Sequence, residues 1–323
     1  MRVFPQTLSV SFLRRILVLW VTVLFSSFGQ SQSVVSVADT TGWAPWKLPN
    51  GSAITDVPND QQTGQKTDDF VGNSTTYAFQ QKAGTIGGTD YILLRARMGD
   101  FQGVNQVGGN GMNIGVGFNL DSSANGSIDL IMMMSKTNST SATLSFGTPG
   151  SGANDGPSTT TWTFPSQTAV TLTIYNPASP NPGTGTFYVQ SATAVDSVKL
   201  NTGNSSTEDA WVTFGVSFAT LQTAARTFSK DSASFSSYTV TYSTPITMIG
   251  FTSTQNSSLN QDLAGVTGGV GSSASSSSFA TLGASTTPTT VDPAPVPEPS
   301  TFLMVPALLI PAFMLFRRRQ SFV

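Results

Sequence analysis

The sequence predicts an all-β fold, a β-sandwich or jelly-roll-like single domain with one short helix. Charged residues form only 10% of the 323 residues, where about a quarter is usual. Ser, Thr, Asn, Gln and Gly supply the missing polarity, which leaves few strong helix formers. Short segments rich in Val, Ile, Thr, Phe and Tyr alternate with Gly, Pro, Asn and Asp, the pattern of strands and turns. The 21 Phe residues provide apolar material for a core.

An N-terminal signal peptide is expected at residues 1–33. Three arginines and no acidic residue flank or precede an apolar run at residues 16–28, and small residues follow it. This order of charged, apolar and small residues is typical of a secretory signal peptide. Cleavage is expected after Ser33, with Ser31 and Ala38 as alternative positions. A retained N-terminal membrane helix would explain the same residues, although the apolar run is short for one.

The body is expected at residues 34–282, as an all-β domain outside the cytoplasm. Its strand candidates are residues 76–80, 91–98, 112–120, 127–134, 142–146, 160–164, 170–175, 186–192, 210–218, 238–243 and 246–252. Residues 279–282 are a candidate for one more strand. Strands this short and this numerous, with so little helix, favour two packed sheets.

One strand and one helix of the body show a clear period. In residues 91–98, apolar side chains alternate with Arg95 and Arg97, which predicts that the arginines face solvent. Residues 219–228 carry apolar side chains at helical spacing, so we expect the short helix there. Residues 259–263 are a weaker helical candidate.

A stalk and a membrane anchor are expected after the body. Residues 283–295 are rich in Ser, Thr and Pro and predict an extended stalk. The segment 296–319 opens with Val296, Pro297, Glu298 and Pro299 and closes with Arg317, Arg318 and Arg319. The apolar stretch between them would span about 27 Å as a helix, just enough for a hydrocarbon core. The arginines are expected to stay cytoplasmic, which places the body outside the membrane.

The V-P-E-P motif, the short apolar helix and the arginine cluster together resemble the PEP-CTERM sorting domain, over residues 296–319. In that family a membrane enzyme, exosortase, recognises the tripartite tail and is thought to process it. Members are exported proteins of Gram-negative bacteria, often encoded near exopolysaccharide genes. The resemblance implies exosortase and the export machinery as partners, with a transient anchor in the cytoplasmic membrane. A plain tail anchor is the alternative. The body resembles uncharacterised bodies found with this tail, which implies nothing about its activity.

Charge and composition exclude several classes of function. Six of the 15 basic residues are arginines of the two terminal segments, so residues 34–298 carry nine basic and 17 acidic residues, a net charge of −8. An acidic body argues against nucleic acid and anionic membrane surfaces as partners, and leaves cations and neutral polymers open. The chain has no Cys and no His. Disulfides, thiol nucleophiles, Cys/His zinc sites and His-based triads are therefore excluded.

The best candidate metal site in the sequence is one loop. Its ligands would be Asp121, Ser123, Asn125, Ser127 (through its carbonyl) and Asp129. Their spacing follows the first three-quarters of an EF-hand-type calcium loop, in which alternate oxygens converge on a hard cation. The twelfth position holds Met rather than a bidentate Glu, and the flanks are strands. A β-hairpin turn at the Asn-Gly pair explains the same residues without metal. Calcium and the plain turn therefore both stay open.

No catalytic signature emerges from the motifs, so a non-enzymatic body is expected. The adjacent pairs Asp68-Asp69 and Glu208-Asp209 are expected to be solvated loop charges, since acid/base catalysis needs two carboxylates facing one cleft. The tryptophans are expected to pack in the core or at sheet edges rather than against sugars; they are Trp43, Trp46, Trp162 and Trp211.

Two functions are consistent with these features. The first is an exported cell-envelope or extracellular-matrix protein, located at the outer surface or in the matrix and associated with exopolysaccharide. The alternative is a secreted β-sandwich polysaccharide hydrolase or lyase that uses carboxylates alone. Two carboxylates in one open groove would favour the alternative.

Overall fold

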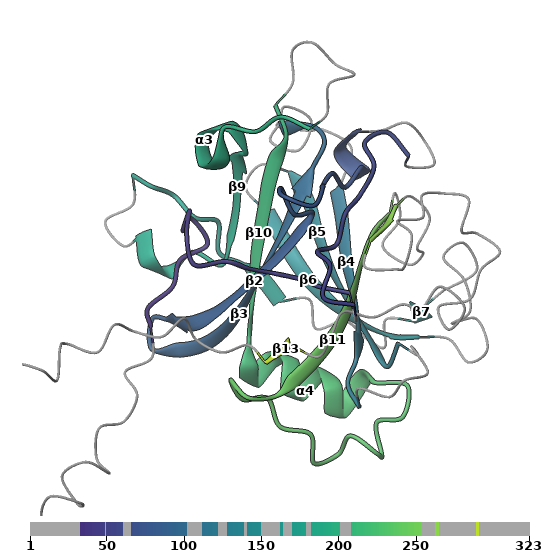
Figure 1. Ribbon diagram of the computed structural model, residues 1–323. Helices are drawn as coiled ribbons and strands as arrows, with labels where there is room; N and C mark the ends of the chain where they lie inside the picture. Colours follow the sequence, from purple (N-terminus) through teal and green to yellow (C-terminus); the bar gives the residue numbers. More distant parts are fainter. Residues whose placement is uncertain are drawn as a thin grey trace, which may run out of the picture. The chain divides into compact units, whose positions relative to one another are not determined.

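A computed structural model of the chain describes residues 33–48, 50–60, 66–101, 112–121, 128–138, 141–149, 162–163, 170–178, 182–200, 208–253, 262–264 and 289–290 (Figure 1). All described elements belong to one compact unit, Val34–Pro295. Apart from Ser33, the expected signal peptide lies outside the described residues, as do the expected sorting motif and the terminal arginines. Among the helices in the described ranges, none has the length and apolar character needed to cross a membrane.

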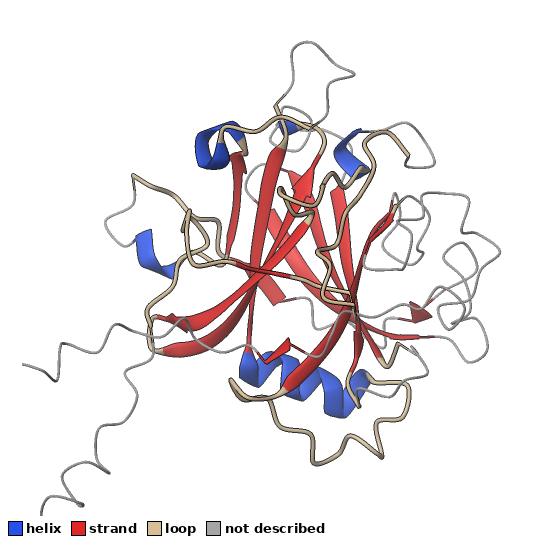
Figure 2. Cartoon of the chain, viewed as in Figure 1, coloured by secondary structure: helices blue, strands red, loops and turns tan. Residues whose placement is uncertain are grey.

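The body is built from two antiparallel sheets, which confirms the all-β prediction (Figure 2). The first sheet has the strand order β1 (Ala44–Pro45), β2 (Phe79–Ile86), β3 (Thr89–Met98), β10 (Ala210–Ser217) and β9 (Phe187–Ser191). The second has the order β12 (Leu263–Ala264), β11 (Pro245–Ser253), β4 (Met112–Asn119), β5 (Leu130–Asn138), β6 (Ser141–Pro149) and β7 (Trp162–Thr163). In addition, β8 (Val170–Leu172) pairs with β6 and β13 (Thr289–Thr290) pairs with β11.

One hydrophobic cluster joins the two sheets. It takes alternate side chains from β3 and β10 on one side and from β4, β5 and β6 on the other. Alternation follows from the two-residue period of a strand, which turns every second side chain to the same face. The contact is tight at Gly250 of β11, where an added Cβ would lie 2.2 Å from the ring of Phe79 in β2. Only a residue without a side chain lets the two sheets approach here.

The α-helix α4 (Phe218–Phe228) closes one end of the body, as predicted for residues 219–228. The hydroxyl of Ser217 accepts the N–H of Thr220 at 3.1 Å, which caps the first turn. Leu221, Ala224 and Ala225 are buried. The helix contacts β3 and β10 of one sheet and β5 and β6 of the other. It lies at the bottom of the view in Figure 1.

The opposite end of the body is formed by the segment around the short helix η1 (Lys66–Asp68). The helix α4 lies near the beginning of β3, because it follows Ser217, which pairs with Tyr91. Phe70 instead bridges to Met98, where β3 ends. The helix η1 contacts β3 and β4, one strand from each sheet. We call this the acidic end, because of the residues described below.

The outer face of β2 and β3 is covered rather than solvated. Residues 35–43 run across it, with the N–H of Val35 donating to Thr85 at 3.1 Å. Val35, Val37 and Leu93 form a second, smaller apolar cluster there with Ile86. Arg95 lies beneath this cover, and Arg97 instead bonds to Asp196, Val198 and Asp209. Both arginines are buried, so the prediction that they face solvent is wrong. The alternation correctly separated two faces, but further segments of the chain bury the outer face as well.

Two other predictions of secondary structure differ from the structure. The predicted strand at 238–243 is wrong, because residues 238–241 form no regular element and residues 242–243 are a turn. The N–H of Tyr238 donates to Phe235, and the N–H of Thr244 donates to Thr241. Ser and Thr hydroxyls in this segment form hydrogen bonds with nearby backbone groups, which would otherwise pair with a neighbouring strand. The described end of the weaker helical candidate 259–263 belongs to the strand β12 instead.

Several short elements were not predicted: β1, β12, β13, the helix α3 (Thr193–Asp196) and the turns η1 and η2 (Pro182–Thr184). Two residues of the expected stalk form β13, so this part of it pairs with the sheet. The candidate strand 279–282 lies outside the described residues.

Candidate functional site

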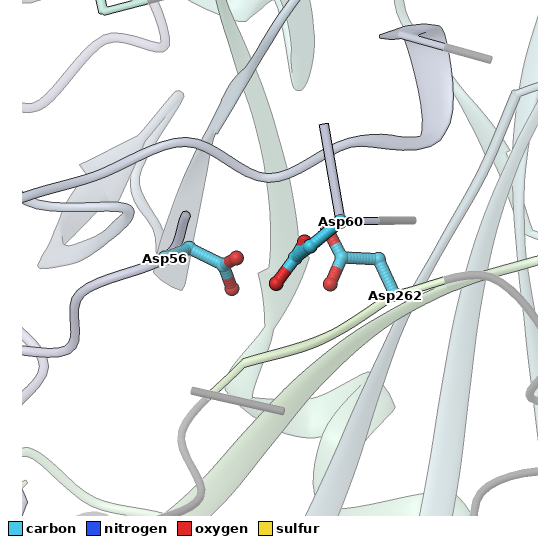
Figure 3. Close-up of side chains that lie close together, drawn as sticks. All are labelled: Asp56, Asp60 and Asp262. Carbon is cyan, nitrogen blue, oxygen red and sulfur yellow. The ribbon is translucent and has the colours of Figure 1, made fainter. Parts of the chain in front are cut away.

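Three carboxylates from distant parts of the chain meet at the acidic end. Asp56, Asp60 and Asp262 each offer an oxygen atom that lies within 4.8 Å of the others, and Figure 3 shows their carboxylates directed toward one another. We call these three residues the Asp56 cluster. Asp56 and Asp60 precede η1, whereas Asp262 lies immediately before β12.

The backbone fixes the positions of the first two carboxylates. Asp56 pairs with Gly72 in an antiparallel bridge, with N–H···O distances of 2.9 and 3.1 Å. The chain then turns at Asn59, whose φ of 69° is the left-handed conformation that Asn tolerates well. The N–H of Asn59 donates to both oxygens of Asp69 at 3.0 Å. This turn brings Asp60 back beside Asp56.

Asp262 is fixed between β11 and the segment after η1. Its two carboxylate oxygens accept the N–H groups of Phe70 at 2.6 Å and of Leu263 at 2.7 Å. Its carbonyl accepts the N–H of Thr252 at 3.0 Å, and the Thr252 hydroxyl donates to the carbonyl of Asp68 at 2.6 Å. Because a carboxylate oxygen can accept two bonds, each oxygen of Asp262 keeps a free lone-pair direction.

Two members of the cluster are buried, and one of them, Asp56, has no hydrogen-bond partner among the described residues. Asp56 is 3% exposed and Asp262 2%. Within the described part of the chain, neither oxygen of Asp56 has a hydrogen-bond partner, nor does Oδ1 of Asp60. Burial raises the pKa of Asp56 well above its usual range, and the charges of Asp262, Asp60 and Asp69 raise it further. The N–H of Val57 lowers that pKa, but by less than any of these groups raises it. Burial also raises the pKa values of Asp262 and Asp60.

The charge of the cluster is not balanced by a described basic side chain. The ion pairs of the described residues join Lys82 to Asp39, and Arg97 to Asp196 and Asp209. Two unit charges no more than 4.8 Å apart repel by at least about 3 kcal/mol at an effective dielectric constant of about 20. Buried carboxylates in this position are stabilised either by bound protons or by a cation among their oxygens.

The loop proposed from the sequence as a calcium site is described only at its ends. Asp121 is exposed, whereas Asp129 is buried. The Asp129 carboxylate accepts the N–H of Leu120 at 2.8 Å, which closes the connection between β4 and β5. Burial raises the pKa of Asp129, and the Leu120 N–H opposes that rise. The other three residues of the set lie outside the described residues: Ser123, Asn125 and Ser127. The hairpin connection and a calcium loop both accommodate this geometry.

The two arginines of β3 form a second buried charged group, which we call the arginine cluster. Arg97 donates to Asp209 at 2.9 and 3.1 Å and to Asp196 at 2.6 Å. Arg95 donates to the carbonyl of Asp39 at 2.6 Å and lies 4.0 Å from the ring centroid of Trp43. Burial lowers the pKa of Arg95 to about 9. Each guanidinium therefore has partners within the chain.

The expectation that the adjacent acid pairs are solvated is wrong for three of the four residues. Asp68, Asp69 and Asp209 are buried, and only Glu208 is exposed. Asp209 is the counter-ion of Arg97, a role that the sequence did not reveal because Arg97 lies on β3 and Asp209 lies far away in the sequence, just before β10. The packing role expected of the tryptophans is confirmed for Trp46 and Trp211, which are buried.

The Asp56 cluster itself was missed by sequence reasoning. Asp56 and Asp60 stand four residues apart around a Pro-Asn turn, a spacing that could have suggested a shared loop. Nothing near Asp262 in the sequence connects it to them, because only strand order brings it there. Comparison of the chain with protein-family models, with curated proteins and with solved structures finds no match.

Proposed function

We propose that this chain is an exported cell-envelope or extracellular-matrix protein of a Gram-negative bacterium, with a non-catalytic β domain. The observation that carries the proposal is the tail at residues 296–319, in which a V-P-E-P motif, an apolar stretch and three arginines follow one another. The signal-peptide pattern at residues 1–33 supports export. The composition of the body, rich in uncharged polar residues and poor in charged ones, fits contact with neutral polymers such as exopolysaccharide.

The proposal assigns a role to each part of the chain. Residues 34–282 form a jelly-roll-like β-sandwich outside the cytoplasm, and residues 283–295 connect it to the tail. Two antiparallel sheets that share one apolar cluster support the sandwich. Exosortase recognises the tail, and the apolar stretch holds the protein in the cytoplasmic membrane until processing.

A non-catalytic body is supported by the state of its buried acids. Asp209 is an ion-pair partner with a fully buried side chain. Asp56 and Asp262 are almost fully enclosed. A polysaccharide chain cannot touch carboxylates that are 2% and 3% exposed unless the segments around them move apart.

The alternative function is a polysaccharide hydrolase or lyase. The observation that favours it is the same cluster, because neighbouring carboxyl groups with raised pKa values are typical of acid catalysts. Asp60, the most exposed member, would then contact the substrate. Release of reducing ends from a panel of bacterial polysaccharides, abolished by Asp60→Asn, would establish this alternative in place of the first.

The tail is tested directly by Glu298→Ala in a host that contains exosortase. We expect export and signal-peptide removal to be unchanged, whereas the tail stays attached, because the substitution removes the one charged side chain of the V-P-E-P motif. Mass spectrometry of the purified protein reports both cleavages. Asp292→Ala is the matched control, since it removes the nearest acidic residue outside the motif, and its tail should be processed normally.

Topology gives a second readout of the same proposal. A reporter fused after Val323 should be active only if it is of the kind that works in the cytoplasm. Activity of a periplasm-only reporter at that position, or equal processing of the Glu298→Ala and wild-type proteins, would contradict the proposal.

A further inference from the structure

The Asp56 cluster combines a concentrated negative charge with a buried side chain that has no partner. Asp56 is 3% exposed, its carboxylate is aimed at Asp60 and Asp262, and neither of its oxygens has a hydrogen-bond partner among the described residues (Figure 3). Folding this side chain away from water is unfavourable unless something replaces its hydration. We propose that the Asp56 cluster is a calcium-binding site, in which one ion replaces that hydration and joins the three carboxylates.

The chemistry of the donors selects a hard cation. All three side chains offer carboxylate oxygens, which calcium and magnesium prefer. Zinc sites are usually completed by His or Cys, and this chain has neither. The inference does not depend on the proposed export or on the tail.

The spacing of the oxygens fits calcium. The ligand atoms of the three residues all lie within 4.8 Å of one another. Calcium binds oxygens at about 2.3 to 2.6 Å, so two ligands on opposite sides of the ion stand about 4.6 to 5.2 Å apart. Magnesium binds at about 2.0 to 2.1 Å and demands near-ideal octahedral geometry. Calcium also tolerates the irregular geometry of ligands drawn from separate loops.

The surroundings leave the donors available. The two hydrogen bonds to Asp262, from Phe70 and Leu263, orient its carboxylate and still leave lone pairs for an ion. Asp60 is only half-buried, so water can complete the coordination on its side. Asp69 lies near enough to add negative charge to the site.

A bound ion would join segments that are distant in the sequence. Asp56 and Asp60 belong to the loop between β1 and β2, and Asp262 leads into β12 at the edge of the other sheet. An ion held by both is lost when they separate, so it stabilises the folded state by mass action. At a hundredfold excess over the dissociation constant, the unfolding equilibrium constant should fall about a hundredfold, or about 2.7 kcal/mol.

The experiment is thermal unfolding of the full chain in detergent, with calcium, with magnesium and with chelator. We expect calcium to raise the melting temperature of the wild type more than magnesium does. Asp56→Asn should abolish the calcium response while unfolding no more easily than the wild type in chelator, because it removes an uncompensated charge. Asp60→Asn, at the exposed side of the cluster, should also abolish the response and gives a variant whose folding is less at risk.

Two matched variants distinguish this site from other buried or acidic residues. Asp68→Asn removes a buried carboxyl outside the cluster, and Asp121→Asn alters the loop between β4 and β5. Both proteins should keep the full calcium response. The proposal is overturned if the wild type shows no calcium-dependent shift or responds equally to magnesium. It is also overturned if Asp56→Asn and Asp60→Asn keep the shift, or if only Asp121→Asn loses it.

Discussion

The arginine cluster and the Asp56 cluster are both buried groups of charge, but only one of them is neutralised by the chain itself. Arg97 is fully buried against Asp209, and Asp196 adds a second carboxylate at 2.6 Å. The ligand oxygens of Asp56, Asp60 and Asp262 lie within 4.8 Å of one another, without a basic side chain among their described ion-pair partners. Burial is therefore not what separates a structural charge from a binding site. The difference is whether the counter-charge is part of the fold.

The comparison also shows how each group is enclosed. The arginine cluster is covered by residues 35–43, where Trp43 stacks on Arg95, and by the segment around α3, where Val198 accepts a bond from Arg97. The Asp56 cluster lies at the acidic end, with Asp60 only half-buried. An internal ion pair can be sealed completely, whereas a site that exchanges an ion needs one accessible ligand.

Arg97→Met should have the largest effect on stability. The substitution leaves Asp209 buried without its counter-ion, and breaking a buried pair in this way costs about 3 to 5 kcal/mol. Urea unfolding measures the loss. Asp56→Asn, which removes a charge that the described chain does not neutralise, should show no such loss in chelator. Equal destabilisation by the two substitutions would remove the distinction between the clusters.

Asp68→Asn should change the pH dependence of stability. Burial raises the pKa of Asp68 to about 7, so between about pH 4 and pH 7 the folded state binds more protons than the unfolded state. The contribution of Asp68 to stability is therefore largest below about pH 4 and is lost progressively as the pH rises to about 7. Relative to wild type in chelator, Asp68→Asn should gain about 2 kcal/mol between pH 5 and pH 7.5. A constant difference across that range would show that Asp68 does not titrate there.

Lys82→Met should have the smallest effect. Lys82 donates to Asp39 at 2.6 Å, but the Asp39 side chain is 31% exposed, so water can replace the lost partner. A pair of this kind contributes less than about 1 kcal/mol, and less again in high salt. Urea unfolding at low and high ionic strength measures this. A loss of stability as large as that of Arg97→Met would mean that burial of an ion pair does not determine how much stability is lost when the pair is broken.

The main strands of the two sheets could be predicted, because the residue types that favour a strand lie within the strand itself. The candidates 91–98, 112–120, 210–218 and 246–252 correspond closely to β3, β4, β10 and β11, since β-branched and aromatic residues mark them directly. The helix α4 could also be predicted, from the helical spacing of its apolar residues.

The burial of charge was not predictable in the same way. Arg95 and Arg97 occupy positions that a two-layer sheet would leave in water, and they are enclosed by residues 35–43 and by the segment around α3. Asp262 reaches Asp56 because β12 pairs with β11 at the edge of its sheet. Such long-range placement depends on strand order, which no local pattern of residues records.

The most direct test of this account is a crystal structure of the protein grown with calcium, with anomalous diffraction used to locate the ion. The account expects one calcium ion bound by carboxylate oxygens of Asp56, Asp60 and Asp262, and none within the arginine cluster. A structure in which this position holds no ion at millimolar calcium, or in which a basic side chain fills it, would contradict the central distinction between the two clusters.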